Sequence, residues 1–293
     1  MTAAVTAQAV LLEYQPTLTR RILLIFLLPA LSALCSASLS LLGCAPAQPA
    51  SVLPQMSSIK TYLTCDPALG APNPRVVDMF AAEKGIDLAS KLQVIDLPGL
   101  KNRSPETYAM NPTGTVPFVE LSDGSFVSET IAICELMEEE TPEPCLFGAT
   151  PSERATTRMW QRRVEQHICL PIISGLRWGP AKEFFAPRGM HGQLANDEAS
   201  EQQFAVSKSQ LKWLDDTMLA AGSTPYICGD RYTIADLQLY TFLSWALSEG
   251  GPQPDVLSDE SLKWVPGWYE RISERAAAVA SDPARAAVAK AAL

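Results

Sequence analysis

The sequence predicts an α/β domain followed by an all-α helical bundle. Three observations lead to this prediction. The chain has 293 residues, more than the roughly 100–200 residues of one typical domain. From Ser58 onward, short strand and helix patterns alternate, whereas after Gly148 the apolar residues recur almost throughout at helical spacing. We therefore expect a leader and linker over residues 1–55, an α/β domain over 58–141 and a helical domain over 149–285.

The first folded domain begins with a β-α-β unit. Residues 59–63 (IKTYL) and 92–97 (LQVIDL) have the β-branched and apolar content of buried strands. The helical segment between them implies that these strands run parallel. A hairpin and a helix over about 129–140 follow, because Asp123-Gly124 readily supplies the positive φ of a tight turn. This order is that of a thioredoxin-like domain.

Helical spacing dominates the second domain. A capping box is expected where Thr233 is followed three residues later by Asp236, whose carboxylate can accept hydrogen bonds from amides at a helix start. We interpret this pair as structural rather than catalytic. The apolar stripe of the first long helix is predicted to consist of Trp160, Val164, His167 and Ile168.

The leader contains an apolar, uncharged run over residues 22–42, directly after Arg20-Arg21. This run is long enough to cross a bilayer. It predicts a cleavable signal for the secretory pathway or an organelle, with Ser36-Ala37-Ser38 as the cleavage region. Two alternatives are a retained membrane anchor and a lipoprotein signal ending at Cys44. A third is translation from Met56, which gives a cytoplasmic protein.

Composition excludes some partners. A formal net charge of −9, without a cluster of Lys and Arg, makes a nucleic-acid partner improbable, because phosphate backbones are repelled. The seven cysteines and two histidines lack the spacing of metal ligands. We expect no metal, and membrane contact only through a retained leader.

The segment NPTGTVPFVELSDGSFVSETIAICELMEE, residues 111–139, resembles the corresponding block of the cytosolic-type glutathione S-transferase family. The resemblance implies a cis Val116-Pro117 bond, with the Val116 backbone pairing with the cysteine of glutathione. It also implies that Glu129 and Thr130 hold the γ-glutamyl carboxylate at the start of a helix. An alternative is that these two residues only cap that helix.

The same resemblance assigns the glycyl carboxylate of glutathione to the connection over residues 100–112. Asn102 and Arg103 match best by position, and Arg103 can form a forked pair with a carboxylate. Lys101 is an alternative.

The segment APNPRVVDMFAAEKG, residues 71–85, predicts a helix with Asn73 at the N-cap and Pro74 at the first helical position. Its amino end is expected to face the thiol of glutathione and to stabilise the thiolate. Ala71 stands where many family members carry a serine or cysteine. The segment is similar to a bacterial and fungal subgroup without an obvious catalytic serine or tyrosine, which favours Asn73 and the amides of residues 73–75. Cys65 as a nucleophile is an alternative.

The electrophile is expected between the two domains. Residues 170–179 (LPIISGLRWG) predict a break in the preceding helix, and Ser174, Arg177 and Trp178 are predicted to line the electrophile pocket. By resemblance, Ser174 is assigned an activating water and hence a catalytic role. A plain kink at Pro171 is the alternative.

The resemblance implies a glutathione transferase. Such an enzyme binds glutathione as co-substrate, stabilises its thiolate and transfers it to a small hydrophobic electrophile, or uses it to reduce peroxides. The alternative function is a non-catalytic binding or interaction protein of the same fold, for which the absence of a hydroxyl at Ala71 is the main argument. The resemblance also implies a homodimer.

Overall fold

The computed structural model describes residues 58–185 and 196–282. The leader and linker expected over residues 1–55 lie outside the described residues, as does the expected end of the helical domain at residue 285. None of the helices within 58–185 and 196–282 is both long and apolar enough to span a membrane.

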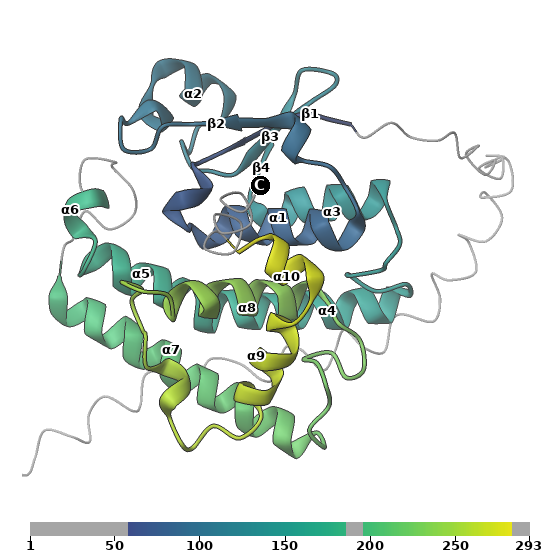
Figure 1. Ribbon diagram of the computed structural model, residues 1–293, viewed down its shortest axis with the longest axis vertical. Helices are drawn as coiled ribbons and strands as arrows, with labels where there is room; N and C mark the ends of the chain where they lie inside the picture. Colours follow the sequence, from purple (N-terminus) through teal and green to yellow (C-terminus); the bar gives the residue numbers. More distant parts are fainter. Residues whose placement is uncertain (1–57, 186–195, 283–293) are drawn as a thin grey trace, which may run out of the picture. The chain divides into compact units, whose positions relative to one another are not determined.

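A four-stranded mixed sheet with the strand order β2-β1-β3-β4 organises the first region (Figure 1). Strand β1 pairs parallel with β2 and antiparallel with β3, and β3 pairs antiparallel with β4. The order confirms the predicted thioredoxin-like arrangement, and Gly124 has the positive φ expected in the hairpin turn. The strands are β1 (Ile59–Thr64), β2 (Leu92–Val94), β3 (Phe118–Leu121) and β4 (Phe126–Ser128).

The predicted buried strand over residues 92–97 is wrong in length and burial. Strand β2 ends at Val94, and it lies at the edge of the sheet because it pairs only with β1. Leu92 and Val94 are therefore 41% and 50% exposed. Only Ile95, just after the strand, is buried.

Helices cover both faces of the sheet. Helices α1 and α3 lie on the face toward the helical region, and α2 lies on the opposite face (Figure 1). The helices of this region are α1 (Pro72–Lys84), α2 (Pro105–Met110) and α3 (Thr130–Glu140). Short 3₁₀ turns precede α1 at η1 (Pro67–Leu69), β2 at η2 (Ala89–Lys91) and α2 at η3 (Lys101–Arg103).

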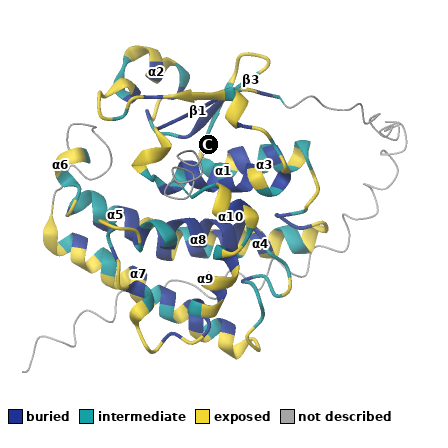
Figure 2. Ribbon diagram, in the orientation of Figure 1, coloured by how far each residue is buried: buried dark blue, intermediate teal, exposed yellow. Residues whose placement is uncertain are grey.

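The second region is helical, and α8 is its buried centre (Figure 2). Helix α8 packs against both α1 and α4, so it joins the sheet-bearing region to the bundle. The helices are α4 (Pro151–Val164), α5 (Leu170–Trp178), α6 (Lys182–Phe185), α7 (Asp197–Ala220), α8 (Ile234–Ala246), α9 (Val265–Ser273) and α10 (Ala276–Ala280), with a 3₁₀ turn η6 (Val256–Ser258).

The capping box predicted at Thr233 and Asp236 is confirmed. The buried Asp236 carboxylate accepts a hydrogen bond from the Thr233 amide at 3.0 Å. It also accepts from the Ile227 amide at 2.8 Å and from the Trp268 indole at 2.9 Å. One carboxylate therefore holds the start of α8, the preceding loop and α9 together.

A second buried aspartate, which the sequence analysis did not identify, ties α7 to α9. Asp215 accepts hydrogen bonds from the amides of Lys263, Trp264 and Val265 at 2.8 to 3.1 Å. These amides belong to the first turn of α9 or directly precede it, so Asp215 caps that helix from a distant part of the chain.

The helix break expected over residues 170–179 lies one turn earlier. Residues Glu165–Cys169 form a π-helical turn between α4 and α5, and α5 continues through Pro171 to Trp178. The extra residue per turn rotates the stripe that packs into the bundle. His167, predicted to lie on that stripe, is consequently exposed, whereas Ile168 is buried.

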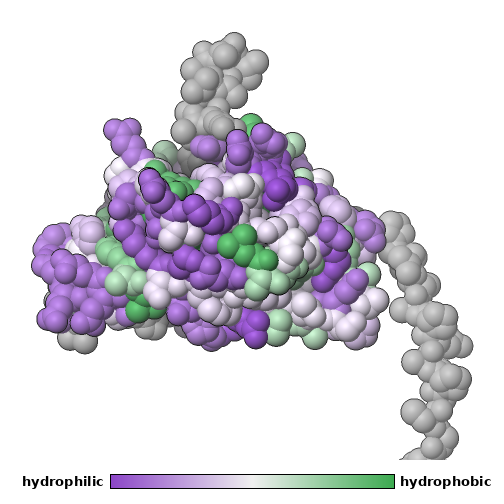
Figure 3. Space-filling model, turned by 90° about the horizontal axis from the view of Figure 1, so that it is seen from below, coloured by the Kyte–Doolittle hydropathy of each residue, from purple (hydrophilic) through white to green (hydrophobic). Residues whose placement is uncertain are grey.

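The face seen from below in Figure 3 is mostly hydrophilic, with small separated hydrophobic patches. Scattered apolar side chains of this kind are normal on soluble surfaces.

Candidate functional site

Three segments of the first region meet at one edge of the sheet, the edge formed by the end of β1, the start of β3 and the end of β4. Leu63 near the end of β1 pairs with Phe118 at the start of β3, and Phe118 pairs with Ser128 at the end of β4. The loop to α1, the residues before β3 and the start of α3 therefore lie at the same edge. These segments contain Val116, Thr130 and Asn73, all predicted to bind glutathione.

Val116 presents an unpaired backbone at this edge. The Val116-Pro117 bond is cis, as the resemblance implied. Neither the N–H nor the C=O of Val116 hydrogen-bonds to another of the residues in 58–185 and 196–282. Since backbone groups in folded chains are nearly always paired, this donor and acceptor are available to a peptide-like ligand.

Side-chain amides fix the loop before Val116. Asn111 donates to the Thr115 carbonyl at 2.9 Å, and Asn102 donates to the Gly114 carbonyl at 2.8 Å. Gly114 has a φ of +59°, and a Cβ there would lie 2.4 Å from Nη1 of Arg103. The Asn102 amide is thus already used, and its buried Oδ1 has no partner and can only accept. This geometry favours a positioning role for Asn102 over contact with a carboxylate.

The Arg103 side chain has N–H donors that are available to a ligand. Its Nη1 donates to the Thr113 carbonyl at 2.8 Å, and its guanidinium lies 5.9 Å from the centre of the Tyr108 ring. Its Nε and one remaining terminal nitrogen, Nη2, are buried and have no hydrogen-bond partner. A guanidinium held in this way can donate two bonds to a carboxylate.

The start of α3 is not capped by a side chain. Glu129 is the N-cap residue, is exposed and has a φ of +73°, which is rare for a residue other than glycine. Neither Glu129 nor Thr130 makes a capping hydrogen bond. The absence of a side-chain cap argues against the alternative in which these residues only cap the helix. The first amides of α3 remain available to an anion.

The start of α1 differs from the prediction. Helix α1 begins at Pro72, and Ala71 occupies the N-cap without a side-chain hydrogen bond. Pro74 has no N–H, and the Arg75 amide is bonded to the Ala71 carbonyl at 3.4 Å. Of the three amides predicted over residues 73–75, only that of Asn73 is free to meet a ligand. The half-buried Asn73 lies within the first turn and is not the cap.

No reactive side chain replaces the missing hydroxyl near Ala71. Cys65 is 1% exposed, and burial raises the pKa of its thiol to about 11. The thiol is therefore protonated at neutral pH, which argues against the alternative of Cys65 as a nucleophile. The Tyr62 hydroxyl is buried and donates to the Pro74 carbonyl at 3.3 Å.

Helix α5 supplies the residues predicted for the electrophile. Ser174, Arg177 and Trp178 are half-buried and share one face of α5, because they stand three and four positions apart. The Arg177 guanidinium lies 5.3 Å from the centre of the Phe185 ring, and its buried Nε has no hydrogen-bond partner. The opposite face is occupied, since Gly175 packs against Phe204.

The guanidinium groups of Arg177 and Arg103 lie close enough for their positive charges to repel each other. Burial lowers the pKa of the Arg177 guanidinium, and the positive charge of Arg103 lowers this pKa further. Among the residues that the structure describes, neither arginine has an acidic partner within 4.0 Å. The two regions thus bring uncompensated positive charge to one place, although the chain as a whole is acidic. Such a place attracts an anionic ligand.

Residues 58–185 and 196–282 contain no group of three or more His, Cys, Asp or Glu side chains that could hold a metal ion.

Comparison with known proteins identifies the class. A profile described as the glutathione S-transferase N-terminal domain matches residues 71–140, and one described as the C-terminal domain matches residues 192–279. Together they cover more than half of the chain. The chain belongs to the glutathione S-transferase family.

Relatives at modest identity agree with this assignment. The chain is 28% identical over 211 residues to glutathione S-transferase 2 of Saccharomyces cerevisiae, covering 70% of this chain and 82% of the relative. It is 24% identical over 222 residues to protein LigF of a Sphingobium species, covering 67% and 83%. The structure is also similar to the solved structure of Gtt2 from Saccharomyces cerevisiae, with a TM-score of 0.62 and 26% sequence identity. The match covers 74% of this chain and 98% of the Gtt2 chain.

Sequence reasoning missed two features of the site. It did not find that Gly114 lets Arg103 and Asn102 approach the loop, although a glycine before the Thr-Val-Pro segment was a usable signal. It also did not bring Arg103 and Arg177 together. They lie in different domains, and no local pattern relates them.

Proposed function

We propose that the protein is a glutathione transferase that binds glutathione, stabilises its thiolate and transfers it to an electrophilic small molecule or uses it to reduce peroxides. The observation that carries this proposal is the unpaired Val116 backbone beside the uncapped start of α3. A peptide-like donor and acceptor next to a carboxylate site match the cysteinyl and γ-glutamyl parts of the tripeptide.

Each of the three residues of glutathione is then assigned a binding group in the site. The cysteinyl backbone pairs with Val116, preceding the cis Pro117, and the γ-glutamyl carboxylate meets the first amides around Thr130. The glycyl carboxylate pairs with the free donors of Arg103. Three anchors that converge on one edge of the sheet would fix the tripeptide in one orientation.

The thiolate is assigned to the start of α1. The free Asn73 amide and the positive end of the helix dipole stabilise the sulfur anion and lower its pKa. The sulfur forms a bond to the electrophilic carbon, and the leaving group departs with the bonding electron pair. Ser174 is proposed to hold an activating water, and Trp178 with Arg177 is proposed to line the pocket of the electrophile.

A non-catalytic binding protein remains the second candidate. One observation favours it: the helix start offers one amide instead of three, and Ala71 provides no hydroxyl. Glutathione would then be bound without activation of its thiol.

Two measurements on the full chain distinguish the candidates. The transferase is expected to be retained on immobilised glutathione and to turn over an aromatic halide with glutathione. Retention without turnover of either the halide or an organic peroxide would support the binding protein. Failure of glutathione to compete the chain off the matrix would overturn the glutathione site.

We also propose that the chain is a homodimer and that its leader directs it to the secretory pathway or an organelle. Light scattering of the purified chain tests the first point. N-terminal sequencing of the protein isolated from cells, together with cell fractionation, separates a cleaved signal from a retained anchor and from a start at Met56.

A further inference from the structure

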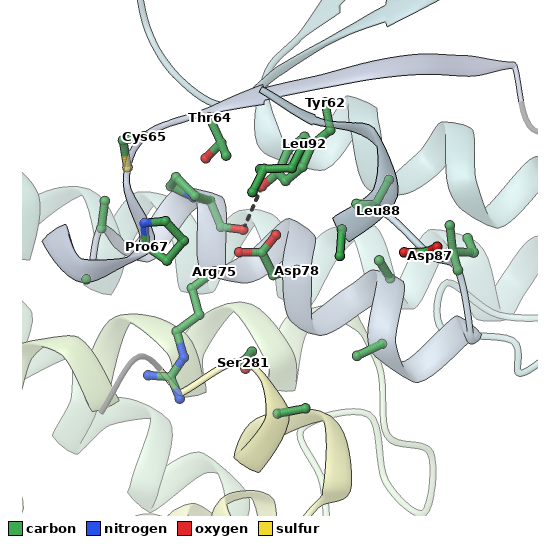
Figure 4. A pocket seen from close by; sticks show the side chains of 18 residues that line it. Tyr62, Thr64, Cys65, Pro67, Arg75, Asp78, Asp87, Leu88, Leu92 and Ser281 are labelled. Atoms are coloured by element: carbon green, nitrogen blue, oxygen red, sulfur yellow. Dashed lines mark hydrogen bonds between the residues drawn. The ribbon is translucent and has the colours of Figure 1, made fainter. Parts of the chain in front are cut away.

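A cavity of about 350 Å³ lies beside α1 (Figure 4). Its walls come from the end of β1, the loop that leads to α1, one face of α1, the segment that contains η2 and β2, and the end of α10 with Ser281 directly after it. A volume of this size accommodates a small organic molecule.

The cavity is separate from the proposed glutathione site. It lies under the β1 and β2 half of the sheet, whereas Val116 and Thr130 belong to the β3 and β4 half. Neither they nor Arg103 line it. The two sites share the loop between β1 and α1 and adjoin at the first turn of α1, where Pro74 and Arg75 line the cavity beside Asn73.

Most of the wall is aliphatic. Ala81, Ile86, Leu88 and Leu92 line the cavity from α1 and from the segment that leads into β2. Leu88 is buried, and Leu92, which is partly exposed, lies near the Tyr62 and Asp78 side chains in Figure 4. A ligand would therefore place hydrocarbon against these residues.

Five side chains that line the cavity carry oxygen atoms, and three of them, Tyr62, Thr64 and Asp78, lie between β1 and α1. Thr64 is 2% exposed, and its buried hydroxyl makes no hydrogen bond of good geometry, although the Tyr62 hydroxyl and the Cys65 thiol lie close enough to interact with it. The Tyr62 hydroxyl and the Asp78 carboxylate lie close together, and Figure 4 shows both directed into the space between β1 and α1. Buried polar atoms without a hydrogen bond of good geometry are rare, so the Thr64 hydroxyl requires an explanation.

Asp78 forms no ion pair among the described residues, although Arg75 also lines the cavity and its charge lowers the pKa of the Asp78 carboxyl. The nearest basic side chain is that of Arg75, on the same helix. Its terminal nitrogens are used elsewhere: Nη1 donates to Ser244 at 2.8 Å, and Nη2 lies 3.9 Å from Asp282. Within 58–185 and 196–282, no Lys, Arg or His nitrogen lies within 4.0 Å of the Asp78 carboxylate.

The Asp78 carboxylate lies in surroundings that disfavour its charge. Burial raises its pKa to about 6, and the Tyr62 hydroxyl and the charge of Arg75 oppose that rise. The group is therefore mostly ionised at neutral pH in surroundings that disfavour the charge. A perturbed carboxylate inside a cavity is typical of a ligand site.

We propose that this cavity binds a small amphiphilic amine. The ammonium group pairs with the Asp78 carboxylate and donates hydrogen bonds to the hydroxyl oxygens of Thr64 and Tyr62. The hydrocarbon part lies against the aliphatic wall. An anion is disfavoured because Asp78 and Asp87 both line the cavity. A neutral ligand would leave the carboxylate uncompensated. This inference does not depend on the proposed transferase activity.

Isothermal titration of the full chain with three matched probes tests the proposal. Cyclohexylamine carries the ammonium, cyclohexanol is its neutral counterpart, and cyclohexanecarboxylate carries the opposite charge. We expect saturable binding of the amine, at least about tenfold weaker binding of the alcohol, and none of the carboxylate at about 10 mM. Equal affinity for amine and alcohol, or no binding of the amine at that concentration, would overturn the proposal.

Substitutions at the cavity test whether Asp78 and Thr64 contact the ammonium group of the ligand. Asp78→Asn is expected to lower the affinity for cyclohexylamine at least about tenfold and to leave that for cyclohexanol unchanged. Asp87→Asn is the matched control, because Asp87 is exposed at the same cavity, and it is expected to bind the amine nearly as the wild type does. Thr64→Val, which replaces the hydroxyl with a methyl group, is expected to weaken the binding of cyclohexylamine. Thermal unfolding verifies that each variant is folded. Unchanged amine binding by Asp78→Asn contradicts the assignment.

Discussion

Arg275 donates two hydrogen bonds to Glu83, with N···O distances of 2.6 and 2.8 Å. Glu83 stands near the end of α1 and Arg275 directly before α10, so this pair joins the sheet-bearing region to the end of the helical region. The Arg275 guanidinium also lies 3.8 Å from the centre of the Tyr232 ring. The pair is largely removed from solvent, since the Glu83 side chain is 10% exposed.

Arg275→Ala is therefore expected to destabilise the fold by about 2 kcal/mol, because it leaves a largely buried carboxylate without its partner. Urea unfolding of the purified variant measures the loss. Arg158→Ala is the control, since Arg158 pairs with Glu135 at 2.9 Å but both side chains are well exposed. This control is expected to lose less than about 0.5 kcal/mol. Equal losses in the two variants would show that the Arg275 pair does not join the regions.

Arg103→Ala is expected to weaken glutathione binding about tenfold or more, because the glycyl carboxylate loses a forked partner. The KM for glutathione, or its Kd from calorimetry, measures this change. Lys101→Ala is the matched control, since Lys101 lies in the same 3₁₀ turn and is exposed. A loss in Lys101→Ala as large as that in Arg103→Ala would reassign the carboxylate to the alternative residue.

The pH dependence of stability provides a test of Asp78. Its folded-state pKa of about 6 lies above the ordinary value of 3.8, so the folded chain holds a proton that the unfolded chain releases between these values. Wild-type stability should therefore fall as the pH rises through this window. The charged or titratable groups around Asp78 are Arg75 on its own helix, Tyr62 and Cys65 from β1 and its end, Cys134 on α3, and Asp87.

Asp78→Asn removes this effect. The variant is expected to be about 1–2 kcal/mol more stable than the wild type at neutral pH, a value reduced from the full shift because Asp78 is partly exposed. Near pH 4 the two proteins should be equally stable. Denaturant unfolding across this pH range, without added amines, measures the difference. A variant that is less stable at neutral pH would contradict the view of Asp78 as an uncompensated charge.

Local patterns predicted much of the fold. The Asp123-Gly124 turn and the box of Thr233 and Asp236 each depend on a few neighbouring residues, and both occur as predicted. The start of α1 was misplaced because two prolines alternate with Asn73, and either Pro72 or Pro74 can begin a helix. The π-helical turn before α5 had no sequence signal that the analysis used, because packing within the bundle decides it.

The candidate site was predictable only where one segment supplies it. Val116 and Thr130 lie in a single hairpin and its following helix, so their relation was encoded locally. The approach of Arg103 to Arg177 and the cavity beside Asp78 need residues from distant parts of the chain, such as Ser281. Tertiary packing brings these residues together, and no periodic pattern in the sequence indicates that they are close.

The most direct test of the catalytic account is the pKa of the glutathione thiol in the complex, followed by the ultraviolet absorption of the thiolate. We predict a value at least about one unit below the free value of about 8.5 in the wild type and in Asn73→Ala, which keeps the backbone amide. Asn73→Pro removes that amide at a position where proline fits the first helical turn, and it should return the pKa toward the free value. A bound thiol that ionises in the wild type no more readily than in buffer, or equally in Asn73→Pro and Asn73→Ala, would contradict stabilisation of the thiolate by the Asn73 amide.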